Sequence, residues 1–227
     1  MQTFRRLAAF TAAALLTTLA PAQQPNLAKV IAQLDQASTK FQSTQADFEW
    51  DTYERVVKET TKQSGTIYFL RKGAETQMGA KFTSPSVQIL QYQNGIGERF
   101  DPSLNQIDQA KAASFAAFLT LGFGGSGSDL AKSWIIADQG TEPITVDGKT
   151  LNTEKLDLVS KDPNVRNNFS HITLWVDLQR GISLKQQAFM PGGDYKTSFY
   201  SHIRYNEKID TSPYAIKRNS KTTIVNH

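Results

Sequence analysis

The sequence predicts a mainly β protein with some α structure. The expected fold is an antiparallel, incomplete (half) β-barrel with an N-terminal helix and apolar lid helices that cover a hydrophobic cavity. Roughly ten short stretches alternate apolar and polar residues, which is typical of half-buried strands. Most connections between them are short, which favours antiparallel pairing. Two other stretches are helical or uniformly apolar, and a sheet of this size wraps around such helices.

The helical stretch comes first and covers Asn26 to Phe41. Its apolar residues recur at spacings of three and four, as they do on one face of a helix: Leu27, Val30, Ile31, Leu34, Ala37 and Phe41. We expect this helix to close one end of the sheet. A second interpretation, that its apolar face forms a wall of the pocket, stays open.

The first predicted strands follow this helix. Ala46, Phe48 and Trp50 share one side of a strand. The charged residues 54–63 are predicted to form a long turn. Further strands are predicted over residues 66–70, 74–82, 87–93 and 96–100. The last two are joined by Asn94-Gly95, a pair that suits a tight hairpin turn.

The uniformly apolar stretch runs from Ala112 to Phe123, and its only polar residues are Ser114 and Thr120. It is shorter than the roughly 20 residues that span a bilayer. A glycine cluster at residues 122–127 follows, which predicts a helix end and a hinge. We interpret the stretch as a movable helix packed against the hollow of a curved sheet, forming a lidded apolar pocket. An ordinary core helix fits the pattern equally well.

The second half of the chain is predicted to be mostly strands. A short helix is expected over residues 128–134. Short strands are expected at residues 135–136, 145–146, 154–159, 172–176 and 183–190. A long last strand, 195–205, alternates Tyr195, Thr197, Phe199, Ser201, Ile203 and Tyr205 on one side. Residues 206–227 are polar and predicted to be an irregular tail.

The N-terminus has the features of a secretory signal peptide, predicted over residues 1–22. Arg5 and Arg6 precede an apolar core, and Ala20-Pro21-Ala22 is a small-residue cleavage site. Residues 23–213 are expected to form a single domain, followed by a polar tail over 214–227. Export without a second membrane-spanning run predicts a soluble periplasmic protein.

Composition narrows the classes of function. The chain has no cysteine, which excludes disulfides, thiolate metal sites and a lipid-modified cysteine. The net charge of +4 falls to about +2 once Arg5 and Arg6 are removed with the signal peptide. The basic residues are scattered, so no nucleic-acid partner is expected.

Catalytic chemistry has little support in the sequence. The three histidines, His171, His202 and His227, show no metal-binding spacing. Residues 125–128 contain serine and glycine, but they form neither a nucleophile elbow nor a phosphate loop. We therefore expect no enzyme activity, no catalytic residue, no metal and no cofactor. An unrecognised hydrolase remains a minor alternative.

Arg71 is the charged residue that points to a function. It has the same parity as Ile67 and Phe69 at the end of a predicted strand, so it faces the hollow if they do. A guanidinium beside an apolar pocket needs acceptors, and carbonyls at the end of a broken helix supply them. Arg71 is therefore predicted to latch the lid. The alternative is an arginine that reaches past the strand end to water.

The residues predicted to line the cavity and lid were chosen by parity and position. For each of them, ordinary core packing is the alternative. They are Phe48, Trp50, Ile67, Phe69, Met78, Leu90, Phe115, Phe118, Leu119, Phe123 and Trp134.

The layout resembles the LolA-type periplasmic carriers of outer-membrane lipoproteins over most of the chain after the signal peptide. The local match is Gly65-Thr-Ile-Tyr-Phe-Leu-Arg71, with Asn94-Gly95 matching the family's hairpin and Phe115 to Leu121 its lid. The resemblance implies that Arg71 bonds to the lid helices and helps the cavity close and reopen. The chain departs from the family at Lys72, where a proline is usual, and in its richer glycine content after the lid.

The resemblance also implies a function. A soluble periplasmic carrier would bind the acyl chains of lipoproteins in its apolar cavity and move them from the inner to the outer membrane, without catalysis. Its partners would be acylated lipoproteins, an inner-membrane lipoprotein-release complex and an outer-membrane receptor, and we expect a monomer. The alternative is a periplasmic lipid- or glycolipid-binding protein of the same fold that serves another envelope pathway.

Overall fold

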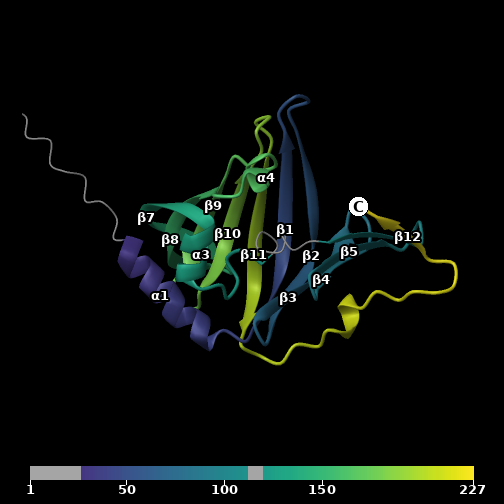
Figure 1. The fold of residues 1–227 in the computed structure, drawn as a ribbon, viewed down its shortest axis with the longest axis horizontal. Coiled ribbons are helices and arrows are strands. Elements are labelled where there is room, and N and C mark those ends of the chain that lie inside the picture. The colour runs from purple at the N-terminus through teal and green to yellow at the C-terminus, as the bar shows by residue number, and fades with distance from the viewer. Residues whose placement is uncertain (1–26, 112–119) are drawn as a thin grey trace, which may run out of the picture.

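The computed structural model describes residues 27–111 and 120–227. They form one twelve-stranded sheet that curves without closing, in the order β12-β6-β5-β4-β3-β2-β1-β11-β10-β9-β8-β7 (Figure 1). Neighbouring strands are antiparallel except β12 and β6, which are parallel. The predicted class is confirmed: the protein is mainly β, with an open, largely antiparallel curved sheet and an N-terminal helix.

The bounds of the elements are as follows. The strands are β1 (Ser43–Glu54), β2 (Glu59–Lys72), β3 (Glu75–Ser84), β4 (Gln88–Gln93), β5 (Ile96–Asp101), β6 (Gln106–Lys111), β7 (Trp134–Val146), β8 (Lys149–Ser160), β9 (His171–Asp177), β10 (Ile182–Phe189), β11 (Tyr195–Tyr205) and β12 (Thr223–Asn226). The helices are α1 (Leu27–Lys40), α3 (Gly127–Ser133), α4 (Pro163–Arg166) and the 3-10 turn η1 (Ser212–Tyr214).

The hairpin of β1 and β2 is longer than predicted. The charged residues 54–63, predicted as a long turn, mostly belong to the strands, because β1 continues to Glu54 and β2 begins at Glu59. Lys62 lies 3.1 Å from the carboxylates of both Glu49 and Asp51 on the solvent side. The hairpin projects beyond the sheet (Figure 1), so its charges are compatible with strand structure. The Asn94-Gly95 turn is confirmed, with positive φ values of 53° and 73°.

The edge strand β7 also differs from the prediction. The stretches 135–136 and 145–146, predicted as separate strands, are parts of the thirteen-residue β7. Its pairing with β8 shifts between Asp138 and Thr141, where Gly140 has φ of +81°. This bulge and Pro143 interrupt the apolar alternation that marks a strand, because neither fits a regular ladder.

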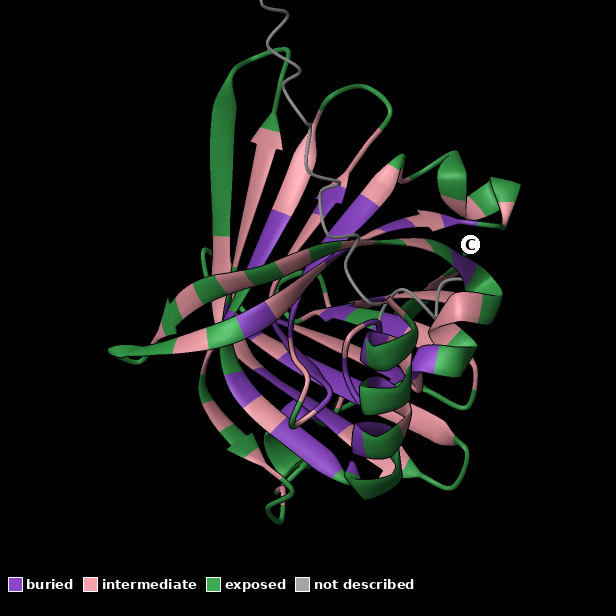
Figure 2. Cartoon of the chain, turned by 90° about the vertical axis from the view of Figure 1, so that its left-hand side faces the viewer, coloured by how far each residue is buried: buried purple, intermediate pink, exposed green. Residues whose placement is uncertain are grey.

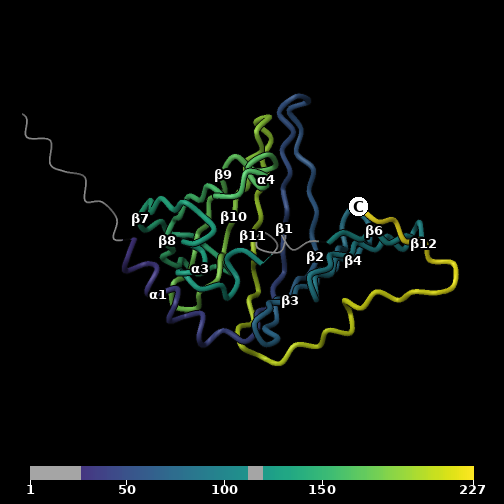
Figure 3. Tube along the Cα trace, viewed as in Figure 1, coloured from purple at the N-terminus to yellow at the C-terminus, as the bar shows by residue number. Residues whose placement is uncertain are grey.

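Most of residues 206–222 are irregular, as predicted, but the segment is not a free tail, because it contains η1 and ends in β12. Figure 3 shows this segment running along the sheet to β12, the strand that pairs with β6. Tyr214 is only 1% exposed, its ring centroid lies 4.8 Å from that of Tyr68, and its carbonyl accepts from Gln91 Nε2 at 2.8 Å. The polar β6 was missed because Ile107 is its main buried apolar residue. The sheet therefore has twelve strands instead of about ten.

Burial is concentrated in the middle of the strands, while the hairpin tips are exposed (Figure 2). The predicted helix over residues 26–41 is confirmed as α1, which buries Val30, Leu34 and Ala37. Val30 and Leu34 pack with residues of β8 and β9, including Leu156 and Leu174. A second part of the core lies on β1, β2 and β3. The helix therefore covers one end of the curved sheet.

Candidate functional site

The inner face of the sheet is formed by adjacent strands that present apolar residues in register. Ile67 of β2 pairs with Ala46 of β1 and Ala80 of β3, and Phe69 pairs with Met78. Ile67, Phe69 and Met78 are each at most 2% exposed. Their shared parity places them on one face, as the alternation predicted.

A cavity of about 180 Å³ lies on this inner face, and we call it the sheet cavity. Its lining is mostly apolar, with an ammonium and a few polar groups. The lining residues are Trp50, Ile67, Phe69, Met78, Leu90, Ile172, Gln186, Ala188, Lys196, Ser198 and Tyr200. The structure thus brings together Trp50, Ile67, Phe69, Met78 and Leu90 from the predicted site. Their role in lipid binding stays a prediction.

The other predicted site residues lie elsewhere. Phe48 packs behind the sheet cavity, with its ring centroid 4.6 Å from that of Trp50. Phe123 stacks on Phe69, with centroids 3.7 Å apart. Trp134 lines a different cavity. The remaining three residues, Phe115, Phe118 and Leu119, lie outside the described residues, as does most of the predicted lid helix.

The cavity lined by Trp134 has a volume of about 210 Å³ and lies between α1, α3 and the inner face of β8 and β9. We call it the helix cavity. Leu34 of α1, Trp134 of β7 and Leu156 of β8 contribute to its wall. The structure therefore holds apolar space on both sides of the segment that connects the lid stretch to α3.

That segment, residues 120–126, is called the cover loop below. The predicted helix was expected to reach Phe123, but residues 120–122 form a turn closed by a 3.0 Å bond from the Phe123 amide to the Thr120 carbonyl. Gly122 has φ of +77°, which a helix does not accommodate. Phe123 then makes a β-bridge with Ile182 of β10. Residues 120–123 are therefore not helical, in contrast to the prediction.

The glycines of the cover loop allow close packing. Gly124 has φ of +74°, and a Cβ there would lie 2.1 Å from the ring of Phe41. Further contacts tie the loop to β10: the Ser183 amide donates to the Gly122 carbonyl at 2.7 Å, and Gln186 Nε2 donates to the Leu121 carbonyl at 2.7 Å. In this structure the loop is held down on the sheet.

Arg71 of β2 also contacts the cover loop. Its Nη2 donates to the carbonyl of Gly124, and its guanidinium carbon lies 5.6 Å from the centroid of the Phe41 ring. The buried Arg71 Nε has no acceptor among residues 27–111 and 120–227. Arg71 therefore faces the hollow and bonds to a backbone carbonyl of the cover loop. Its role as a latch stays a prediction.

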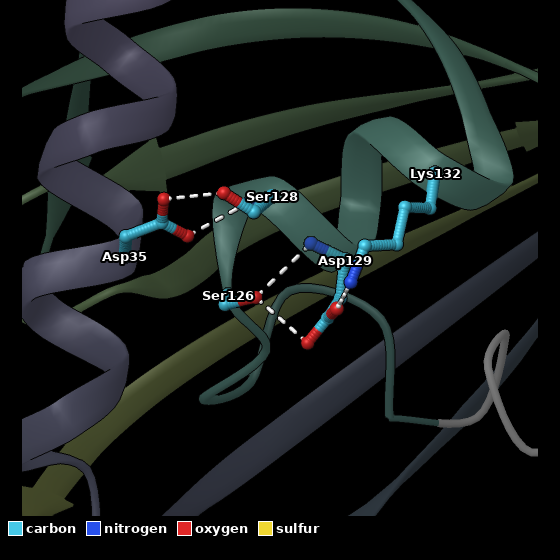
Figure 4. A network of polar contacts seen from close by, with 5 residues as sticks. All are labelled: Asp35, Ser126, Ser128, Asp129 and Lys132. Atoms are coloured by element: carbon cyan, nitrogen blue, oxygen red, sulfur yellow. Dashed lines mark hydrogen bonds and ion pairs between the residues drawn. The ribbon is translucent and has the colours of Figure 1, made fainter.

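A polar network attaches the next helix, α3, to α1 (Figure 4). Asp35 accepts from the amide and the hydroxyl of Ser128 at 2.8 and 2.6 Å, and these bonds lower the pKa of the Asp35 carboxyl. Ser126 caps α3 by accepting from the Asp129 amide at 3.0 Å. Asp129 also pairs with Lys132 at 2.7 Å. These contacts attach the end of the cover loop to α1 and α3.

The polar lining residues of β11 were missed by the sequence prediction. The predicted alternation put Tyr195, Phe199 and Ile203 on the same side along the whole strand, whereas the cavity is lined by residues of the other parity: Lys196, Ser198 and Tyr200. The pairing with β1 slips near His202, which has φ of +48°, so the parity reverses and Ile203 joins the inner cluster. The sequence does not indicate that His202 adopts a positive φ, so this reversal could not be predicted.

Burial controls the ionisation of these groups. Burial, with a smaller contribution from the nearby Arg99 guanidinium, lowers the pKa of the Lys196 ammonium to about 8. Burial raises the pKa of the Tyr200 hydroxyl. The sheet cavity is thus a poorly solvated space that contains one ionisable cation.

The described part of the chain offers neither a metal site nor a membrane-spanning helix. Residues 27–111 and 120–227 contain no group of three or more His, Asp or Glu side chains placed to hold a metal ion. No helix within these same ranges has both the length and the apolar character required to cross a bilayer. The sheet cavity and the helix cavity are therefore the features that we consider for function.

Neither a protein-family model nor a curated protein sequence matches the chain. Its fold is similar to that of MucB, with a TM-score of 0.53 and 14% identity over 88% of this chain, which spans 65% of MucB. It is also similar to an uncharacterised conserved protein from Thermus thermophilus, with a TM-score of 0.53 and 9% identity over 88% of this chain and 98% of that one.

A LolA superfamily protein from Nitrosomonas europaea matches with a TM-score of 0.42 and 13% identity, over 84% of this chain and 97% of that protein. The matches to MucB and the Thermus thermophilus protein show a similar fold at low sequence identity. The similarity concerns the fold alone.

Proposed function

We propose that this protein binds acyl chains in the sheet cavity and carries them through the cell envelope. The observation that carries the proposal is an apolar cavity on the inner face of an open sheet, next to a loop attached by a few hydrogen bonds. Each buried CH₂ group of a ligand contributes about 0.8 kcal/mol, so an apolar wall binds a chain without specific bonds. No chemical reaction is part of the proposed role.

The first candidate cargo is an acylated lipoprotein. The resemblance of the sequence to LolA-type carriers supports it, through the strand that ends at Arg71 and the apolar stretch that follows β6. In this proposal the predicted signal peptide directs the protein to the periplasm. An inner-membrane release complex would load the cargo, and an outer-membrane receptor would accept it.

The second candidate cargo is a free lipid, and one specific observation favours it. The ammonium of Lys196 faces the sheet cavity, where a ligand with an acidic head would compensate its charge. The acyl end of a lipoprotein carries ester and amide groups instead. The two cargoes therefore differ in what they offer to Lys196.

Native mass spectrometry of protein purified from the periplasm tests the proposal. A bound species of lipid mass, identified after extraction, is the expected result, and a co-purifying lipoprotein would favour the first cargo. Protein that is empty and also fails to bind a fluorescent fatty acid would contradict the proposal.

A pair of variants makes this test specific to the sheet cavity. Leu90→Asp places a charge on a half-buried wall residue and should lower the amount of bound lipid at least tenfold. Ile135→Asp makes the same type of change at a side chain that is 61% exposed, and it should retain wild-type binding. Equal binding by both variants would place the ligand elsewhere.

A further inference from the structure

Lys196 occupies a defined position on the wall of the sheet cavity. On β11 it pairs with Thr52 of β1 and Ala188 of β10. Its Nζ lies 3.6 Å from the centroid of the Trp50 ring, which also lines the cavity. A cation over an aromatic face is attracted to it, but the ring supplies no oxygen or nitrogen acceptor for the N–H donors of the ammonium.

The cavity has a polar end and an apolar end. Along β11 the exposure falls from the half-buried Lys196 to 8% at Ser198 and 4% at Tyr200. Along β1 it falls in the same direction, from the half-buried Trp50 to 3% at Phe48. An elongated amphiphile would therefore lie with its head near Lys196 and its tail near Tyr200.

The polar end is also electropositive. Arg99 on β5, which pairs with Leu90 of the cavity wall, is close enough to Lys196 to disfavour its charged form. The Arg99 guanidinium bonds to the amide oxygen of Gln88 at 2.8 and 3.0 Å, so this contact does not neutralise it. Asp101, further along β5, accepts from the amide and hydroxyl of Ser103. In the described part of the chain Lys196 has no ion-pair partner.

We infer that the sheet cavity takes an amphiphile with an acidic head, a carboxylate or a phosphate, whose head binds Lys196 while its tail lies on Phe69, Met78 and Tyr200. The inference rests on the proposed acyl-chain function and specifies the chemistry of its ligand. A half-buried cation without a counter-ion is destabilising, and an anionic oxygen that accepts its N–H donors offsets part of that destabilisation. Arg99 at the rim would attract the same head as it approaches.

The test compares one chain with and without its charge. cis-Parinaric acid and its methyl ester carry the same fluorescent tail, and only the acid has a carboxylate at neutral pH. The wild-type protein should bind the acid at least about tenfold more tightly than the ester. Lys196→Met should bind the ester as the wild type does and the acid no better than the ester.

Lys185→Met is the matched control. Lys185 lies on the opposite face of the sheet, and its Nζ is 4.1 Å from the centroid of the Trp175 ring. The variant removes the same charge and the same type of aromatic contact outside the cavity, so it should keep the preference for the acid. If Lys185→Met also lost the preference for the acid, the preference would depend on net charge alone, and the inference would be overturned.

Competition tests whether each kind of acidic head binds and whether binding requires the tail. Dodecanoate and a lysophosphatidic acid should both displace cis-parinaric acid, whereas acetate and inorganic phosphate at the same concentrations should not, because they lack the tail. Equal binding of acid and ester by the wild type would refute the acidic-head inference and leave the proposed function standing. Failure of all variants to bind either probe would refute both.

Discussion

Phe69 and Phe123 stack face to face, with ring centroids 3.7 Å apart and ring planes 6° apart. Phe69 belongs to the sheet and Phe123 to the cover loop, so this pair joins the loop to the wall of the sheet cavity. Phe123 is only 1% exposed, and its ring also meets that of Tyr200 edge-on at 4.9 Å. The position of the cover loop thus depends on an aromatic contact as well as on hydrogen bonds.

Phe123→Ala should lower the free energy of unfolding by about 3 kcal/mol, because it removes a buried ring and leaves a void against Phe69. Urea denaturation measures this. Phe199→Ala is the control, since Phe199 is 40% exposed on the other face, and its cost should be clearly smaller. If both variants lost the same free energy of unfolding, the Phe69–Phe123 stack would not anchor the loop.

Arg71→Leu should leave the fold and lipid binding intact but impair delivery of lipid to acceptor vesicles. The guanidinium bonds to Gly124 only while the loop lies on the sheet, so its loss changes the balance between covered and open states. The expected loss of stability is about 1 kcal/mol. Arg71→Lys, which retains a donor, should recover part of the delivery. Normal delivery by Arg71→Leu would exclude a latch.

The Arg71 contact shows how far sequence reasoning reached into this site. Strict alternation on β2 placed Ile67, Phe69 and Arg71 on one face, and register with β1 and β3 makes that face the inner one. The acceptor had to be a backbone carbonyl near the broken helix, but Gly124 itself depends on how the loop folds. Gln186 also bonds to the loop, but it lies on β10, far along the chain, and no local sequence pattern indicates this contact.

Lys196→Met should stabilise the unliganded protein at pH 7 by about 1 to 2 kcal/mol, less than the full pKa difference implies because Lys196 is half-buried. In the folded protein its pKa is about 8, below the usual value of about 10.4. Between these pH values the unfolded chain binds more protons, so wild-type stability rises with pH.

The advantage of Lys196→Met should therefore shrink between pH 7 and pH 9.5, as urea denaturation at several pH values would show. Tyr200 stays neutral because burial raises its pKa. An advantage that is constant with pH would indicate that Lys196 is well solvated.

Arg218→Ala should cost about 1 to 3 kcal/mol by urea denaturation. Arg218 Nη2 bonds to Glu98, which is only 7% exposed, at 2.6 Å, and the variant leaves that carboxylate with Gln109 as its remaining partner. Adding Glu98→Gln should recover part of the loss, because the buried charge is then gone. No recovery would mean that Arg218 acts through packing of the C-terminal segment.

This ion pair also shows why the attachment of the C-terminal segment to the sheet was not predicted. Sequence patterns detect apolar periodicity, and residues 206–227 have little of it. The segment is held by separate contacts instead: the single buried ring of Tyr214, the Glu98–Arg218 pair and the short β12. Such contacts join residues far apart in the chain and have no spacing rule.

The bulge and proline of β7 have a consequence for how the protein keeps its sheet open. In the described structure β7 is the last strand on its side, and an unpaired edge is a template for strands of other chains. Pro143 removes one amide donor, and the irregular pairing between Asp138 and Thr141 breaks the edge into short runs. At the other end, β12 offers only four residues. An open sheet can therefore present its hollow without nucleating fibrous assembly.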